Sequence, residues 1–123
     1  MADQTPEDLY AKMLRKPLFV ITTTPARGPG IQEVLAEHLD YQVALERAGT
    51  LFGAGPLFEE GSDVPYGGMI ILRARDEAEA RTIADADPFH AQGLRHYTVN
   101  RWLMNEGSMT LTIRYSDQSA VIG

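Results

Sequence analysis

The side chains best suited to chemistry in this chain are His38 and Asp87, an aspartate that opens an Asp-Pro-Phe turn. A carboxylate that bonds one imidazole nitrogen fixes the tautomer and stabilises the protonated ring, which makes the histidine a positioned general acid or base. If the fold brings the two together, the sequence predicts proton transfer on a bound small molecule. Loss of a leaving group would make the reaction an elimination, and return of the proton elsewhere would make it an isomerisation.

His38 lies in the middle of the apolar face of a predicted helix that runs from Ile31 to about Ala48. Helical residues three or four apart share a face, and a polar side chain buried there without a partner costs about 1 to 3 kcal/mol. His38 and Gln42 interrupt this face one turn apart, so we expect a cavity beside them. The alternative is a core histidine bonded to a backbone carbonyl. The face consists of Ile31, Val34, Leu35, His38, Gln42 and Leu45.

Asp87 also fits a purely structural role, because aspartate is a favoured helix N-cap and proline is favoured directly after it. The two roles are compatible, since one carboxylate oxygen can cap a helix while the other accepts from a histidine. Asp87 and His90 could also join His38 around a divalent ion. No second close pair of histidines or carboxylates supports this, so we predict no metal. No serine stands in a nucleophile-elbow pattern.

Several residues are candidate ligand contacts. Gln42 is placed to donate to a substrate oxygen from its position beside His38. Gly55 and Pro56 predict an irregular strand whose backbone a ligand can approach. Large aromatic residues could line an apolar pocket or simply fill the core, and both interpretations stay open. These aromatic residues are Phe52, Phe89 and Trp102.

Composition narrows the classes of function. The chain has 123 residues and a net charge of −6, without a cluster of Lys and Arg, so nucleic acid is not an expected partner. There is no cysteine, which excludes disulfides and thiol catalysis. The first residues are acidic and no apolar run is long enough to span a bilayer, so we expect a cytoplasmic protein with no membrane contact. Gly28, Gly30, Gly67 and Gly68 lack the context of a phosphate loop, and we predict no cofactor.

The pattern of elements predicts a ferredoxin-like α+β fold. A leading helix capped by Thr5 is expected to about Arg15. Strands are predicted at 18–23, 50–58, 68–74, 95–104 and 109–115, and helices at 31–48 and 76–86. Without the leading helix and the last strand this is βαββαβ, an antiparallel sheet with two helices on one face. The other face would be exposed, so we expect homodimerisation through it.

The residues also resemble those of the YCII-related family. The similarity rests on His38, Leu45-Glu46, Gly49, Ala54-Gly55-Pro56, Asp85-Ala86-Asp87-Pro88-Phe89, Gly93-Leu94 and a strand ending at Trp102. It implies a ferredoxin-like domain that pairs into a dimeric α+β barrel, with His38 facing Asp87 in the active site. A characterised branch of the family eliminates chloride from a chlorinated hydroxyquinol, and related dimeric barrels isomerise lactones or oxidise aromatics. The leading helix and the strand after Trp102 depart from the shorter family pattern.

The sequence therefore predicts one domain over residues 1–123, with a helical extension at 1–16, a core at 17–104 and a further strand and tail at 105–123. The predicted function is that of a lyase or isomerase acting on an aromatic or lactone-like metabolite. The alternatives are a non-catalytic homodimer that binds or senses a metabolite, and an accessory subunit that docks onto another protein through its leading helix or a sheet edge.

Overall fold

The computed structural model describes residues 3–25 and 30–123, so Gly28 lies outside the described residues. The chain forms two compact units, one made of Pro17–Leu103 and the other of Met1–Lys16 with Met104–Gly123. The larger unit contains every residue that the sequence singles out for chemistry. In the described residues, no helix has the length and apolar character needed to cross a membrane.

The larger unit is built on a four-stranded antiparallel sheet with the strand order β2-β3-β1-β4. Its strands are β1 (Lys16–Thr24), β2 (Leu51–Phe58), β3 (Pro65–Leu72) and β4 (His96–Met104), and its helices are α2 (Ile31–Arg47), α3 (Glu77–Asp85) and the short α4 (Pro88–Ala91). β2 and β3 form the expected hairpin, and β1 pairs with β3 in the middle of the sheet. This is the predicted ferredoxin-like arrangement, with α4 as an addition.

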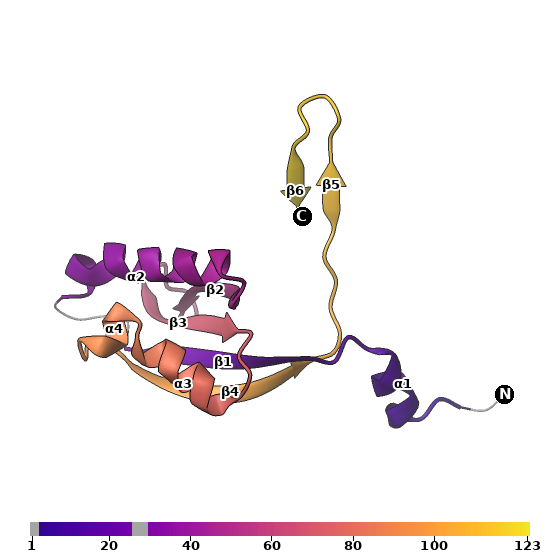
Figure 1. Ribbon diagram of the computed structural model, residues 1–123, viewed down its shortest axis with the longest axis horizontal. Coiled ribbons are helices and arrows are strands. Elements are labelled where there is room, and N and C mark those ends of the chain that lie inside the picture. Colours follow the sequence, from indigo (N-terminus) through magenta and orange to yellow (C-terminus); the bar gives the residue numbers. More distant parts are fainter. Residues whose placement is uncertain (1–2, 26–29) are drawn as a thin grey trace. The chain divides into compact units, whose positions relative to one another are not determined.

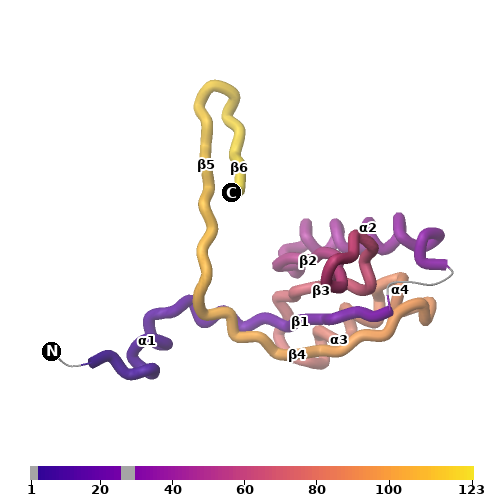
Figure 2. Tube along the Cα trace, turned by 180° about the vertical axis from the view of Figure 1, so that it is seen from behind, coloured from indigo at the N-terminus to yellow at the C-terminus, as the bar shows by residue number. Residues whose placement is uncertain are grey.

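The core lies between one face of the sheet and the helices. Phe19 and Ile21 of β1 pack with Ile70 and Leu72 of β3, against the small residues Ala80 and Ala84 of α3. Leu45 of α2 packs against the same cluster, so both long helices cover one face, as predicted. Figure 1 has α3 and α4 in front of β1 and β4, and the reverse view in Figure 2 brings these strands forward.

Glycines set the ends of α2. Gly30 stands at the N-cap with a φ of 92°, and Gly49 follows the last turn with a φ of 82°. Both values lie in the left-handed region, which glycine adopts without steric cost. Gly49 therefore ends the helix as predicted, and α2 presents Ile31, Val34 and Gln42 as its buried residues.

The smaller unit contains α1 (Pro6–Lys12) and a two-stranded sheet of β5 (Leu111–Ile113) and β6 (Ala120–Ile122). Thr5 and Asp8 form a reciprocal capping box at the start of α1. The helix is shorter than predicted, because Met13 adopts an extended backbone. The strand predicted at 109–115 forms only over three residues, and the pairing strand β6 was not expected from the sequence.

Candidate active site

Asp87 sits between α3 and α4 and caps the second of these helices. Its Oδ1 accepts the backbone N–H of Phe89 at 2.9 Å, and Pro88 fills the first helical position. Unlike most capping residues, it is only 1% exposed. A buried carboxylate requires hydrogen-bond donors for both oxygens, so the cap alone does not account for its burial.

His38 of α2 supplies the next donor. Its Nδ1 lies 2.9 Å from Oδ1 and 2.9 Å from Oδ2 of Asp87. The alternative of a core histidine bonded to a backbone carbonyl is wrong, because the carboxylate takes that place. With Nδ1 directed at an ionised acceptor, a neutral ring carries its proton there. The opposite nitrogen, Nε2, is then left to act on a ligand.

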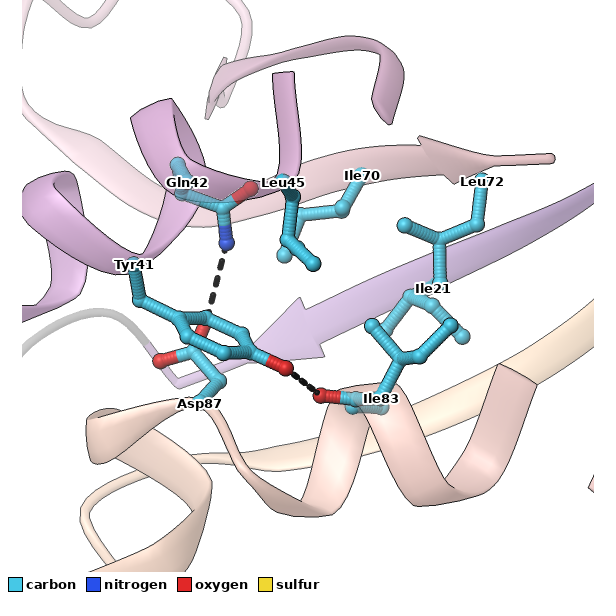
Figure 3. Close-up of a pocket in the computed structure, with 9 residues that line it drawn as sticks. Ile21, Tyr41, Gln42, Leu45, Ile70, Leu72, Ile83 and Asp87 are labelled. Carbon is cyan, nitrogen blue, oxygen red and sulfur yellow. Dashed lines mark hydrogen bonds between the residues drawn. The ribbon is translucent and has the colours of Figure 1, made fainter. Parts of the chain in front are cut away.

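Gln42, one turn further along α2, supplies the remaining donor. Its Nε2 lies 3.0 Å from Oδ2 of Asp87, and Figure 3 shows the amide pointing at the carboxylate. The orientation follows from chemistry, because a reversed amide would set two acceptor oxygens against each other. We predicted that Gln42 donates to a substrate oxygen; in the structure Nε2 donates one of its two N–H groups to Asp87, and the contact with a substrate stays a prediction. Its Oε1 is buried without a hydrogen-bond partner among the described residues.

These donors control the ionisation of Asp87. Burial by itself raises the pKa of the carboxyl, but the hydrogen bond and charge of His38, the Phe89 N–H and the charge of His90 oppose it. Together they hold the pKa of Asp87 below its ordinary value. Asp87 is therefore a carboxylate at neutral pH and can stabilise a protonated His38.

Phe89 forms a platform between two polar side chains. The His38 ring stacks on it with centroids 4.2 Å apart and planes at 21°. The guanidinium of Arg95 lies over the same ring, 4.1 Å from its centre. Two planar groups this close cannot share one face of a phenyl ring, so they lie on opposite faces. Burial lowers the pKa of Arg95 and the charge of Asp87 opposes this effect; an arginine still keeps its charge at neutral pH.

A cleft of about 840 Å³ opens beside this platform. This volume is within the range of small-molecule sites. The sequence-predicted residues His38, Gln42, Gly55, Pro56 and Phe89 all line it. Phe52 lines it as well, so two of the three aromatic residues with two open interpretations, Phe52 and Phe89, line the cleft. Asp87 is not part of the wall and lies behind His38, which matches an orienting role.

Trp102 does not lie with the other predicted ligand contacts. Tyr97 and Val99 of β4 pack against the core cluster beneath the helices. Alternation along a strand therefore turns Trp102 to the opposite face of the sheet. It is 37% exposed there and is absent from the cleft wall. The predicted contact of Trp102 with the ligand of His38 relied on residue type without the strand register, and the structure does not bring the two residues together at this cleft.

His90 contacts a backbone carbonyl and an aromatic ring. Its Nδ1 lies 2.7 Å from the carbonyl oxygen of Ala84, and its ring packs against Tyr97 at 4.8 Å. Within residues 3–25 and 30–123, no group of three or more acidic or histidine side chains is placed to hold a metal ion. A positive charge on His90 lowers the pKa of Asp87.

Arg95 is the cleft residue that the sequence did not suggest. It stands directly before β4, where an arginine is typical of a solvated strand end. The sequence offered one indication of its role, which is that a positively charged residue follows soon after the Asp-Pro-Phe turn. In the structure the backbone N–H groups of Leu94 and Arg95 both donate to the carbonyl of Phe89, which folds this segment back over the phenyl ring.

The structure thus places a His-Asp pair beside a cleft of ligand size on a ferredoxin-like domain. The model of the YCII-related domain matches residues 17–103, and the chain belongs to this family. A similar solved structure is 5-chloro-2-hydroxyhydroquinone dehydrochlorinase from Burkholderia phenoliruptrix AC1100, in complex with 2,5-dihydroxybenzoquinone. Its TM-score is 0.58 at 27% identity, over 69% of this chain and 92% of the other. A comparison with curated proteins gave no match.

Proposed function

We propose that this protein is a lyase or isomerase in which His38 is the general acid and base and Asp87 is the orienting carboxylate. One observation carries the proposal: Nδ1 of His38 is held 2.9 Å from both oxygens of a buried carboxylate while the ring lines a ligand-sized cleft. The pair resembles the histidine and carboxylate of other acid-base sites, where the carboxylate fixes the tautomer.

The proposed reaction begins when Nε2 of His38 takes a proton from a hydroxyl or an activated C–H of the ligand. The electron pair left behind forms a new double bond. In an elimination the leaving group departs with its bonding electrons, so the net loss is one proton and one anion. On an aromatic ring the carbon that carries the leaving group first gains a proton from the imidazolium, which gives the keto tautomer. His38 then takes a second hydroxyl proton as the anion departs. In an isomerisation the imidazolium instead returns the first proton to a different carbon.

The substrate is proposed to be a small aromatic or lactone-like molecule. The cleft is lined by Phe52 and Phe89, together with the glycine-containing strand at Gly55. Flat apolar walls with a few polar groups suit a ring of this size. The dehydrochlorinase of similar structure, which is in complex with 2,5-dihydroxybenzoquinone, supports a ring-sized ligand.

The test is chloride release from 5-chloro-2-hydroxyhydroquinone, followed with the native protein and with His38→Asn. Asparagine can still donate to Asp87 but cannot take a proton, so kcat/KM should fall about 10² to 10⁴-fold, the usual contribution of general acid-base catalysis. His96→Asn is the matched control, because His96 is an exposed residue of β4 outside the cleft wall. Equal rates in the native and His38→Asn proteins would refute the role of His38.

A non-catalytic metabolite-binding homodimer is the alternative, and the same assay separates it. A binding protein would take up 2,5-dihydroxybenzoquinone without converting any substrate of this kind. The accessory-subunit alternative is tested by deleting residues 1–15, which should abolish association with a partner protein and leave the cleft intact.

The dimer itself is also a proposal, made through the sheet face opposite the helices. Val20 and Ile71 are cross-strand partners, and alternation places them opposite Ile21 and Ile70 of the core. A half-buried apolar pair in the middle of a sheet is typical of an association surface. Sedimentation of Val20→Asp should give a monomer where the native protein gives a dimer. Ala78→Asp, on exposed α3, should not change the mass; a native monomer would refute the pairing.

A further inference from the structure

Arg95 has a combination of burial and free donors that the fold does not explain. Its guanidinium covers the face of Phe89 opposite His38, and it lines the cleft. One N–H group is used, since Nη1 donates to Oγ1 of Thr23 at 3.3 Å. Nε is buried and has no hydrogen-bond partner among the described residues. An arginine carries five N–H donors, so most of the donors of Arg95 make no hydrogen bond to the described residues.

The charge of Arg95 is also without a direct counterion among residues 3–25 and 30–123, where no carboxylate lies within ion-pairing distance of its guanidinium. Asp87, the acidic group that influences it, is bonded to His38 on the far side of Phe89. A partly buried cation of this kind favours a ligand that brings its own negative charge.

Gly68 lines the cleft next to Arg95. A Cβ atom at Gly68 would lie 3.7 Å from Nη1 of Arg95 and 3.5 Å from the carbonyl oxygen of Gly55. Any larger side chain at Gly68 would extend into the space next to the guanidinium. Glycine at this position therefore keeps the cation open to the cleft.

We propose that Arg95 binds an ionised ring oxygen of the ligand, so that the substrate is an acidic enol or phenol bound as its anion. His38 then acts from one side of Phe89 on one part of the ring, and Arg95 holds an oxygen from the other side. This inference rests on the proposed function and concerns the same cleft. It predicts ligand affinity, which can be measured without any turnover of substrate.

The experiment compares two quinones by isothermal titration calorimetry at pH 7. The first, 2,5-dihydroxybenzoquinone, is an acidic enol that is ionised at this pH; the second is its dimethyl ether, which has the same ring and no charge. The chain has no cysteine, so neither probe meets a thiol. In Arg95→Met the affinity for the anion should fall about 10 to 100-fold, as for loss of a hydrogen bond to a charged group, and affinity for the ether should change much less.

Arg73→Met is the matched control. Arg73 also lies over an aromatic ring, at 5.2 Å from Phe52, but its Nη1 donates to two backbone carbonyls and it is not in the cleft wall. Arg73→Met and Arg95→Met each remove one positive charge, so any general effect of net charge on anion binding appears in both variants. Arg95→Lys should recover part of the anion affinity, since a lysine keeps the charge without the planar fork.

The outcomes separate charge recognition from a structural role. If Arg95 merely supports the fold, Arg95→Met weakens both probes equally, and the proposal is overturned. It is also overturned if the native protein does not bind 2,5-dihydroxybenzoquinone. Selective loss of the anion supports it even if His38→Asn shows that no proton transfer occurs. Full dependence of turnover on His38 with equal affinities in Arg95→Met would support the proposed function and refute this inference.

Discussion

Two aspartates cap helices within a short stretch of this chain, and they have different surroundings. Asp76 caps α3, accepts the N–H of Glu79 at 2.8 Å and lies at the surface. Asp87 caps α4 in the same way but is 1% exposed and also bonds His38 and Gln42. The two residues follow the same local rule, so local sequence does not explain the difference. It arises because α2 crosses over the second cap and not the first.

The largest expected difference between the two caps is in stability. Asp87→Ala leaves His38, Gln42 and the Phe89 N–H without an acceptor, and should lower the free energy of unfolding by about 3 to 5 kcal/mol, as for a broken buried pair. Asp76→Ala removes an exposed cap and should cost about 1 kcal/mol. Urea unfolding at pH 7 measures both.

Asp87→Asn refines this comparison, because asparagine is a good N-cap and should preserve the start of α4. Any loss beyond that of Asp76→Asn then reports the contacts with α2. If the two substitutions to alanine cost the same, Asp87 is a cap and nothing more, and the dyad would lose its energetic support.

The second difference concerns pH. In the native protein the pKa of Asp87 lies below its ordinary value, so its ionisation stabilises the fold above about pH 3.9, the value for an unfolded aspartate. That contribution is lost as the pH falls through the lower folded value. His38→Phe removes the hydrogen bond and the charge while a ring remains to stack on Phe89. Burial then dominates, and the pKa of Asp87 should rise above its ordinary value.

In His38→Phe, the contribution of Asp87 to stability changes with pH in the opposite direction. A carboxyl whose folded pKa is raised contributes more stability as the pH falls through that pKa, because the folded state then holds the proton more tightly. Carbon NMR of the Asp87 carboxyl through a pH titration measures the shift directly. The same midpoint in native protein and His38→Phe would mean that the two side chains do not interact in solution.

Much of this arrangement was predictable, and the limits have physical causes. Helical periodicity placed His38 and Gln42 on one buried face, and the Asp87-Pro88 pair indicated a helix start. Patterns within one helix or strand do not predict how far that element lies from the others. The partner of Gln42 and the platform between His38 and Arg95 depend on how α2 lies over the turn before β4, which no spacing within one element encodes.

The two units of the chain show the same limit. In Pro17–Leu103, the alternation at 95–104 correctly predicted a strand, because a covering layer selects one face of β4. In the smaller unit the same alternation at Met109–Tyr115 predicted a longer strand than forms, and Leu111 and Ile113 are exposed. Alternation predicts an extended backbone, but a strand reaches full length only where a partner pairs with it.

Gln42 gives the smallest expected effect and the most specific one. Asp76 lacks a partner of this kind, yet Oε1 of Gln42 makes no hydrogen bond to the described residues, and Gln42 lines a small pocket of about 10 Å³. Figure 3 shows the apolar side chains around this space, among them Leu45 and Ile70. Gln42→Leu keeps a similar volume, removes a donor to Asp87 and removes the unpaired oxygen. These effects oppose each other, so the free energy of unfolding should change by less than about 1 kcal/mol.

The opposing terms can be separated by comparison with Gln42→Met, which also lacks the amide but is unbranched. If the space beside Oε1 holds no water, both variants should have a free energy of unfolding close to that of the native protein. Each loses one hydrogen bond to Asp87 and also loses one buried polar atom that has no partner. A loss of about 3 kcal/mol in both would mean that Oε1 has a partner in solution, and a volume near 10 Å³ sits at the lower limit for one buried water. In that case Gln42 would link Asp87 to a water. Asp87 would then differ from Asp76 by a chain of hydrogen bonds that runs through Gln42 to that water.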